Sequence, residues 1–262
     1  MSGLACFKNC GSVMVTGANR GLGLQLVESL VTGGFSPGKI IATARDPGSA
    51  LKLNELAKKH PQVHIITLDV QSQEGIQKCA EEVHQLVQEE GLNCLINNAG
   101  VNVVADLHTV TAEKMIENFH TNAVAPLMIT KAFLPLLKQA ASRAPRGAVS
   151  MSIQRAAVVN MSSLLGSIKL VSAEQMNTFN WYPYRTSKSA LNMVSRCLAV
   201  DLEPDGILCV AVHPGWVRTD MGGSQAPLSP EESVSSLLSV LGGLSEKDHG
   251  SFVNYTGEPL PW

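Results

Sequence analysis

Four residues spread over the middle of the chain, Asn122, Ser163, Tyr184 and Lys188, have side chains that together could move a proton. Tyr184 and Lys188 are four residues apart, so both side chains lie on one face if the segment is helical. A free tyrosine, with a pKa of about 10, is a poor proton-transfer group at neutral pH. An ammonium group beside the phenol favours the phenolate and lowers that pKa. The spacing therefore predicts an acid/base pair, next to which Ser163 could donate a hydrogen bond to a carbonyl oxygen.

A glycine-rich segment, TGANRGLG at residues 16–23, lies upstream, between an apolar run and a helical pattern. Glycines at a strand-to-helix turn allow a tight bend and a close approach of the backbone to a pyrophosphate, whose charge meets the helix N-terminus. The spacing of Gly17, Gly21 and Gly23 differs from the commoner GxGxxG pattern, and such a turn can be purely structural. Because strand, turn and helix occur in the required order, we expect this segment to bind a dinucleotide.

The second apolar run ends in Ala44, Arg45 and Asp46, a position that distinguishes the two nicotinamide cofactors. Enzymes that prefer NAD place an acid at this strand tip to bind the ribose 2′-hydroxyl. Here Arg45 and Arg20 could grip a 2′-phosphate with charge-assisted bonds. Alternatively, Arg45 only decorates the following turn and Asp46 faces the ribose. The absence of a carboxylate at Ala44 favours NADP(H).

Two more polar segments follow apolar runs. Asp69 could accept a hydrogen bond from the adenine amino group, and Asn98 and Gly100 of the segment 97–100 (NNAG) could border the adenine ribose. Asparagines at such a place also suit a plain turn, because they tolerate unusual backbone angles. The two interpretations are compatible.

These segments need a scaffold that brings the ends of several strands together. Short runs rich in Val, Ile and Ala alternate with longer helical patterns, which indicates a parallel sheet covered by helices on both faces. The expected strands are 12–16, 39–43, 63–68, 93–97, 156–161, 206–212 and 251–254, and the expected helices are 21–33, 49–59, 72–90, 111–140, 183–203 and 230–242. The stretches 141–155 and 164–182 are expected to be surface loops. We therefore predict one α/β domain over residues 1–262, with a Rossmann-type, doubly wound, seven-stranded parallel sheet.

The composition is that of an ordinary globular protein: of 262 residues, 45% are hydrophobic and 16% charged, and the net charge is −2. No run of lysine or arginine points to nucleic acid or an anionic membrane surface. No apolar stretch approaches the ~18 residues of a membrane span, and no signal core precedes the first apolar run. Six cysteines without a CxxC pair suggest buried free thiols. We expect a cytoplasmic protein without a metal site.

Taken together, the motifs resemble those of the short-chain dehydrogenase/reductase family over essentially the whole chain, and most of all its sniffer and C-factor-like carbonyl reductases. The matching segments are TGANRGLG (16–23), NNAG (97–100), FHTNAVAP (119–126), NMSS (160–163), YRTSK (184–188) and HPGWVRTDM (213–221). The resemblance implies catalysis by Ser163, Tyr184 and Lys188, with Asn122 holding a water that connects Lys188 to solvent.

The family pattern also chooses between two adjacent serines. Strand alternation points Ser162 and Ser163 to opposite faces, and the pattern, with Gly166 three residues later, assigns the second. The predicted cofactor site comprises Gly17, Asn19, Arg20, Gly21, Leu22, Gly23, Ala44, Arg45, Asp69, Val70, Asn98, Ala99, Gly100, Tyr184, Lys188, Pro214, Gly215, Val217 and Thr219. The resemblance places the last four beside the nicotinamide.

The segment between Ser163 and Tyr184 is longer than is usual in the family and rich in aromatic residues, whereas the stretch after Met221 is short. The aromatic side chains could wall a substrate pocket, form a dimer surface or cover the sheet edge. A short lid predicts an open site and loose substrate choice. The proposed pocket walls are Val101, Val103, Leu164, Met176, Trp181, Trp216 and Met221.

The expected function is NADPH-dependent reduction of aldehydes, ketones or quinones, with a broad apolar substrate range and tyrosine as the proton donor. The alternatives are an alcohol dehydrogenase of the steroid, retinoid or prostanoid type, and a dinucleotide-binding signalling or sensor protein. The helix after Tyr184 is apolar around much of its circumference, so it must be covered by more than the sheet. Members of the family often pair through this helix and the one containing Asn122, so the resemblance implies a homodimer.

Overall fold

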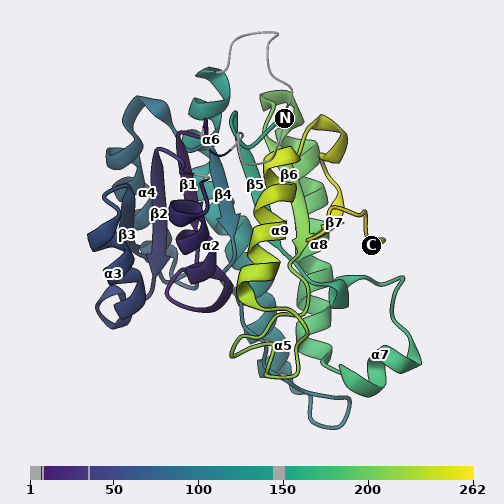
Figure 1. Ribbon diagram of the computed structural model, residues 1–262. Coiled ribbons are helices and arrows are strands. Elements are labelled where there is room, and N and C mark those ends of the chain that lie inside the picture. Colours follow the sequence, from purple (N-terminus) through teal and green to yellow (C-terminus); the bar gives the residue numbers. More distant parts are fainter. Residues whose placement is uncertain (1–6, 8, 35, 144–150) are drawn as a thin grey trace.

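A seven-stranded, all-parallel sheet forms the centre of the computed structural model, which describes residues 7, 9–34, 36–143 and 151–262 (Figure 1). The strand order is β3-β2-β1-β4-β5-β6-β7, so the winding reverses between β1 and β4. The strands are β1 (Ser12–Val15), β2 (Lys39–Ala44), β3 (Val63–Thr67), β4 (Cys94–Asn97), β5 (Ala157–Met161), β6 (Leu208–His213) and β7 (Phe252–Asn254). All seven predicted strands are present, which confirms the predicted fold class.

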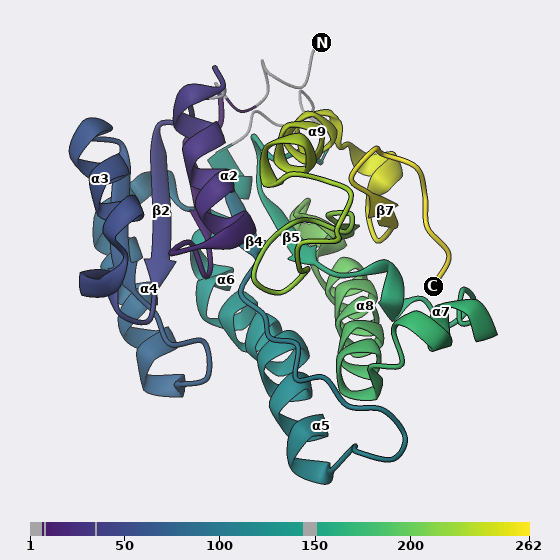
Figure 2. The same ribbon diagram turned by 60° about the horizontal axis from the view of Figure 1, so that its bottom comes forward.

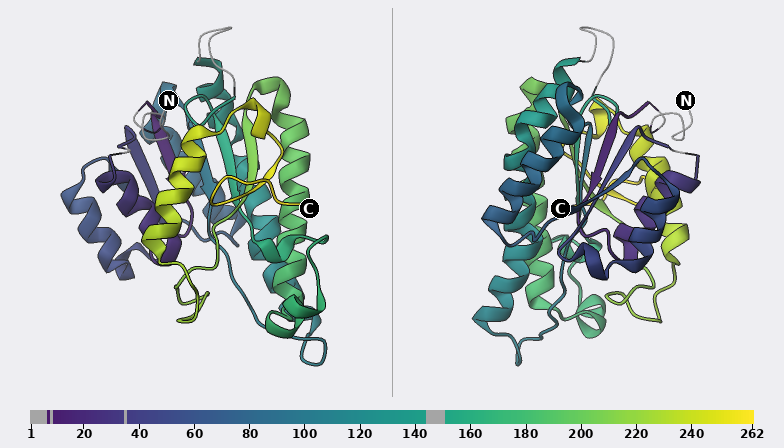
Figure 3. Two further views of the ribbon diagram at one scale, coloured as in Figure 1. Left: turned by 45° about the vertical axis from the view of Figure 1, so that its right-hand side comes forward. Right: turned by 90° about the vertical axis from the view of Figure 1, so that its left-hand side faces the viewer.

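Helices cover both faces of this sheet because most strand residues are apolar and successive side chains point to opposite faces. On one face, Val13 and Val15 pack with α2 (Gly21–Thr32), α3 (Leu51–Lys59) and α9 (Pro230–Gly243). On the other, Met14 packs with α4 (Gln73–Val87), α6 (Ala125–Arg143) and α8 (Tyr182–Leu202). The two helical layers are seen on either side of the sheet in Figure 3.

The helix predicted over 111–140 differs from the observed one. It consists of α5 (Ala112–Phe119) and α6, joined by a π-helical turn at His120–Val124, in which Ala125 N donates to His120 O. The apolar period continues through the turn, so the sequence does not reveal it. The turn matters because it contains Asn122.

The stretch 164–182, predicted to be a surface loop, contains a 3₁₀ turn at Leu164–Gly166 and a short helix, α7 (Ala173–Thr178). Ser172 caps α7 by accepting a hydrogen bond from Gln175 N at 3.3 Å. Six residues are too few for a helical period to stand out. Of the other predicted loop, 141–155, the first three residues continue α6 and positions 144–150 lie outside the described residues.

Candidate active site

The predicted site residues come together because the carboxyl ends of parallel strands meet at one edge of the sheet, and a winding reversal opens a crevice there. Figure 2 shows this edge turned towards the viewer. The segments that follow the strands at this edge are the glycine turn after β1, Arg45 after β2, Asp69 after β3, NNAG after β4, Ser163 after β5 and Pro214 after β6. Segments that follow six of the seven strands therefore lie at this edge.

The glycine turn is shaped by close backbone packing. Gly17 has φ +65°, and a Cβ there would lie 3.0 Å from Ala99 Cα; a Cβ on Gly23 would collide with Gly17 O. Gly21, with φ +54°, opens α2. Only glycine fits these positions without strain.

The N-terminus of α2 fits a bound anion. Its N-cap residue, Arg20, makes no side-chain capping bond, and the first turn holds no acid. Helices α3 and α8 also lack a side-chain cap, whereas α4, α5, α7 and α9 begin with a Ser or Thr that accepts from their own first turn. Uncapped N–H groups at the positive end of a helix favour a phosphate group.

The NNAG segment holds the glycine turn in place. Thr16 Oγ1 accepts from the main-chain N–H groups of Asn98 and Ala99, each at 3.0 Å. Asn98 Nδ2 donates in return to Thr16 O at 2.9 Å and to Gly17 O at 3.2 Å. The side-chain nitrogen of Asn98 thus stabilises the turn itself. The predicted contact of Asn98 with the ribose would therefore be made by its side-chain oxygen.

The corner predicted to bind a 2′-phosphate has two exposed arginines. Ala44 is buried, Arg45 is exposed, and Asp46 Oδ1 accepts from Gly48 N at 3.0 Å, which turns this carboxylate towards the next turn. Arg20 Nη1 lies 3.2 Å from Asp220 Oδ2, and both side chains are largely exposed. An exposed ion pair of this kind contributes little stability, so Arg20 can be drawn to a more strongly charged partner.

Tyr184 and Lys188 lie on one face of α8, as their spacing predicted, with Lys188 Nζ 5.6 Å from the centre of the Tyr184 ring. A side-chain hydrogen bond joins Tyr184 to Ser163. Lys188 Nζ donates to Met161 O at 2.7 Å. Three of the four predicted catalytic side chains therefore form one contiguous group between β5 and α8.

The protonation states of this pair are set by burial. Burial raises the pKa of Tyr184 to about 12, and the hydrogen bond with Ser163 offsets only part of that effect. Burial likewise lowers the pKa of Lys188 to about 8. The expectation that Lys188 lowers the pKa of the phenol is therefore not met in the protein alone, because desolvation disfavours the charged form of both groups. At neutral pH the phenol carries its proton.

Ser162 and Ser163 point to different partners, in agreement with strand alternation. Ser162 Oγ donates to Asn192 Oδ1 at 2.6 Å in the buried interior. Ser163 Oγ accepts from Leu165 N at 3.2 Å, and its hydroxyl also interacts with the phenol of Tyr184. The geometry favours Ser163 as the serine that faces a substrate.

Asn122 lies behind this group, in the π-helical turn. Its Nδ2 donates to Val101 O at 2.8 Å and to Ser187 Oγ at 2.9 Å, and its Oδ1 accepts from Val101 N. A Cβ on Gly100 would lie 3.1 Å from Asn122 Oδ1 and 3.7 Å from Lys188 Nζ. Gly100 therefore leaves open the space between Asn122 and Lys188, where the water implied by the resemblance would sit.

The segment after β6 reaches across to the glycine turn. A Cβ on Gly21 would lie 3.7 Å from Thr219 Cγ2. Gly215 has φ +86°, and Val217 forms a parallel bridge with Leu228. This segment and the glycine turn thus lie against each other, and the contact of Pro214, Gly215, Val217 and Thr219 with the nicotinamide stays a prediction.

Two of the predicted pocket residues, Trp181 and Trp216, are brought together near Tyr184. Both rings contact Phe179 edge-on, with centroids 5.0 and 5.2 Å away, and the Trp181 and Tyr184 rings are 6.3 Å apart. The sequence prediction omitted Phe179, although its position two residues before Trp181 could have indicated it. We name Phe179, Trp181 and Trp216 the aromatic bracket.

The other predicted pocket residues are less directly engaged. The main-chain N–H groups of Val101 and Val103 donate to Asn122 and Asn118. Leu164 opens the 3₁₀ turn after Ser163, and Met176 lies half-buried on α7. Met221 is 46% exposed on the rim.

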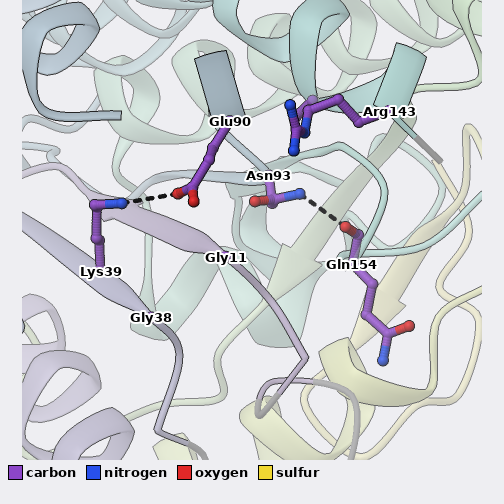
Figure 4. A pocket seen from close by; sticks show the side chains of 8 residues that line it. Gly11, Gly38, Lys39, Glu90, Asn93, Arg143 and Gln154 are labelled. Atoms are coloured by element: carbon purple, nitrogen blue, oxygen red, sulfur yellow. Dashed lines mark hydrogen bonds and ion pairs between the residues drawn. The ribbon is translucent and has the colours of Figure 1, made fainter. Parts of the chain in front are cut away.

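A cavity of about 450 Å³ lies at the opposite edge of the sheet, where the strands begin (Figure 4). Its lining includes Lys39, Glu90, Asn93, Arg143 and Gln154. Lys39 and Glu90 are paired at 2.8 Å, and Asn93 donates to Gln154 O. The cavity is remote from Tyr184, so we assign the chemistry to the crevice, where the reactive groups converge.

A profile of the short chain dehydrogenase family matches residues 12–228. The chain belongs to the short-chain dehydrogenase/reductase family. The carbonyl reductase Sniffer of Drosophila melanogaster is 42% identical, with a TM-score of 0.90, over 97% of this chain and 100% of that one. An NADPH-bound carbonyl reductase from chicken fatty liver is also 42% identical, with a TM-score of 0.92, over 97% and 94% of the two chains.

Among curated relatives, C-signal of Myxococcus xanthus is 39% identical over 173 residues, which are 65% of this chain and 93% of that protein. Mouse retinol dehydrogenase 5 is 30% identical over 86% of this chain and 60% of its own. Family membership and these neighbours identify the protein as an oxidoreductase of the short-chain dehydrogenase/reductase family. None of the helices that the structure describes is long and apolar enough to span a membrane.

Proposed function

We propose that the protein is a cytoplasmic NADPH-dependent carbonyl reductase that accepts apolar aldehydes, ketones or quinones. The observation that carries the proposal is the group formed by Ser163, Tyr184 and Lys188, in which the phenol interacts with a serine hydroxyl and lies beside a lysine. This group lies at the same edge of the sheet as the glycine turn. The similarity to carbonyl reductases, one of them NADPH-bound, supports the same function.

The residues divide the chemistry between them. NADPH, when bound, would supply a hydride to the carbonyl carbon. Ser163 donates a hydrogen bond to the carbonyl oxygen, and Tyr184 gives that oxygen its proton as negative charge develops there. Because burial keeps the pKa of Tyr184 near 12, the phenol is in the donor form throughout the physiological range. Lys188, with its pKa lowered to about 8, still carries most of its charge at pH 7 and stabilises the phenolate left behind.

The residues present fit NADPH better than NADH. The small buried Ala44 occupies the strand tip where an acid would bind a ribose hydroxyl, and Arg20 and Arg45 supply two exposed guanidinium groups nearby. Asp46 is engaged with Gly48. The uncapped N-terminus of α2 is suited to the pyrophosphate.

Two other functions remain as candidates. Similarity to a protein named C-signal supports a dinucleotide-binding signalling protein, and similarity to retinol dehydrogenase 5 supports a narrow retinoid-type alcohol dehydrogenase. A pure binding protein has no need of a buried phenol joined to a serine. Turnover of many unrelated carbonyl compounds would distinguish a broad reductase from a narrow dehydrogenase.

The test is NADPH oxidation over a panel of aldehydes, ketones and quinones, with Tyr184→Phe as the matched control. We expect turnover by the wild type and a loss of at least about a thousandfold in Tyr184→Phe, because the substitution removes the proton donor. NADPH binding, followed by cofactor fluorescence, should stay within about threefold, since the ring is kept. A wild type inactive on the whole panel, with intact NADPH binding, would favour the signalling function.

A further inference from the structure

The insertion between Ser163 and Tyr184 carries a helix with little support of its own. Helix α7 stands away from the sheet at the lower right of Figure 1 and makes only sparse contacts with the other elements. Residues 171–174 and 177–178 are exposed, Val171 among them at 51%. The aromatic residues that follow α7 can stay in place only if a contact from another element fixes the position of α7.

Arg185 provides that support from α8. Its Nε donates to Phe179 O at 2.7 Å, and its Nη1 lies 3.5 Å from Gln175 Oε1 on α7. The guanidinium thus spans the end of α7 and the residue after it. Phe179 N in turn donates to Gln175 O at 2.8 Å, so the main chain of Phe179 is held on both sides.

The burial of Arg185 is unusual for a charged residue. It is only 6% exposed, none of the ion pairs recorded within the described residues includes it, and Nη2 has no hydrogen-bond partner. Burial lowers the pKa of its guanidinium. A buried charge without an opposite charge is unfavourable for folding. An apolar side chain would fill the same space equally well. The presence of an arginine is therefore better explained by the hydrogen bonds that its guanidinium donates to the insertion.

What those donors hold is the aromatic bracket. Phe179, fixed through its carbonyl, contacts both Trp181 and Trp216, and the Trp181 ring lies 6.3 Å from Tyr184. Trp216 is anchored separately, since its Nε1 donates to Gly222 O at 2.8 Å. Without Arg185, the side of the bracket that comes from the insertion would lose its main-chain anchor, whereas Trp216 would keep its own.

We propose that Arg185 is a positioning residue that fixes the aromatic bracket as a wall beside Tyr184 and thereby selects for flat, bulky apolar carbonyl substrates. The inference rests on the proposed function. The side-chain hydrogen bonds of Arg185 go to Phe179 and Gln175, which both belong to the insertion. Its effect is expected where the substrate contacts the wall, in KM for large substrates, and not in the chemical step.

The experiment compares Arg185→Lys with Arg196→Lys. Arg196 is a matched control, because it lies on the same helix and its Nη1 also donates to a main-chain oxygen, Gly250 O at 2.9 Å, away from the insertion. Steady-state kinetics are measured with 2-naphthaldehyde as the flat bulky substrate and propanal as the small one. Hydrogen exchange of residues 173–182 is followed in parallel.

For Arg185→Lys we expect KM for 2-naphthaldehyde to rise about tenfold with kcat within about twofold, and propanal kinetics to change less than about twofold. Exchange over 173–182 should become faster. Arg196→Lys should leave all of these at wild-type values. Phe179→Leu, which keeps Arg185 and removes the central ring, should reproduce the rise in KM and serves if Arg185→Lys does not fold.

Three results would overturn the inference. One is an equal loss on both aldehydes in Arg185→Lys, which would place its effect on the catalytic group. Another is unchanged exchange over 173–182, and the third is faster exchange without a change in KM for 2-naphthaldehyde. A wild type inactive on both aldehydes would instead overturn the proposed function and the selection role with it.

Discussion

Ser162 and Ser163 are adjacent and chemically identical, but their surroundings differ, and we expect them to have different roles. Ser163→Ala removes the hydroxyl that contacts Tyr184, and we expect kcat/KM to fall by about 10²–10³ with an unchanged melting temperature. Ser162→Ala leaves the buried Oδ1 of Asn192 without its 2.6 Å donor, so we expect a loss of about 1–3 kcal/mol in the free energy of unfolding. Its kcat/KM should stay within about threefold. Kinetics and thermal melts of the two variants decide the matter, and the reverse pattern would reassign the serine.

At the scale of residues, the sequence predicts which side chains lie close together, but not how their surroundings shift their pKa values. The four-residue spacing of Tyr184 and Lys188 places both on one helix face. The direction of their pKa shifts depends on burial between β5 and α8, which the local sequence does not encode. Arg185 was passed over for the same reason. Within the segment YRTSK, Arg185 resembles an ordinary residue on a helix surface. In the structure it is buried and hydrogen-bonded to the insertion, which the local sequence does not indicate.

Among the secondary-structure elements, the strands are predicted correctly, because the sheet is buried on both of its faces. Most residues of the seven strands are apolar, and the strands alternate with helical patterns, so the sheet follows from composition and order. The π-helical turn at 120–124 and the six-residue α7 were missed, because neither changes the hydrophobic period enough to be seen. The cysteines show the same dependence on context. The five that the structure describes are free, as expected, but Cys197 is exposed rather than buried.

The turn after β2 is where an element sets the choice of cofactor. Arg45→Asp replaces a cation with an acid beside the buried Ala44, and we expect the ratio of NADPH to NADH affinity to fall about a hundredfold. Lys59→Asp makes the same change in charge at the far end of α3, and should leave the ratio within about twofold. Titrations with both cofactors measure the ratio. An unchanged preference in Arg45→Asp would mean that Arg45 only decorates the turn.

At the scale of the whole molecule, two neighbouring helices among the described residues expose large apolar side chains. Helices α5 and α8 pack side by side and expose Ile116 and Phe119 on the first and Met193 and Val200 on the second, at 49–66%. Leu191 and Leu198 on the opposite side of α8 are buried, so the helix is apolar on both sides, as the sequence predicted. We propose that a second copy of the chain covers this surface, because large apolar patches usually mark interfaces.

Met193→Glu tests the dimer by placing a charge at the centre of the proposed contact. We expect the wild type to sediment as a dimer at micromolar concentration, and the variant as a monomer, since burying an unpaired carboxylate is strongly unfavourable. Leu51→Glu is the matched control: Leu51 is 71% exposed at the start of α3, on the other face of the sheet, so its replacement should leave the dimer intact. Analytical ultracentrifugation gives the masses. A monomeric wild type would contradict the proposal. Dissociation by both variants would show that added charge alone separates the copies, and would move the interface away from α5 and α8.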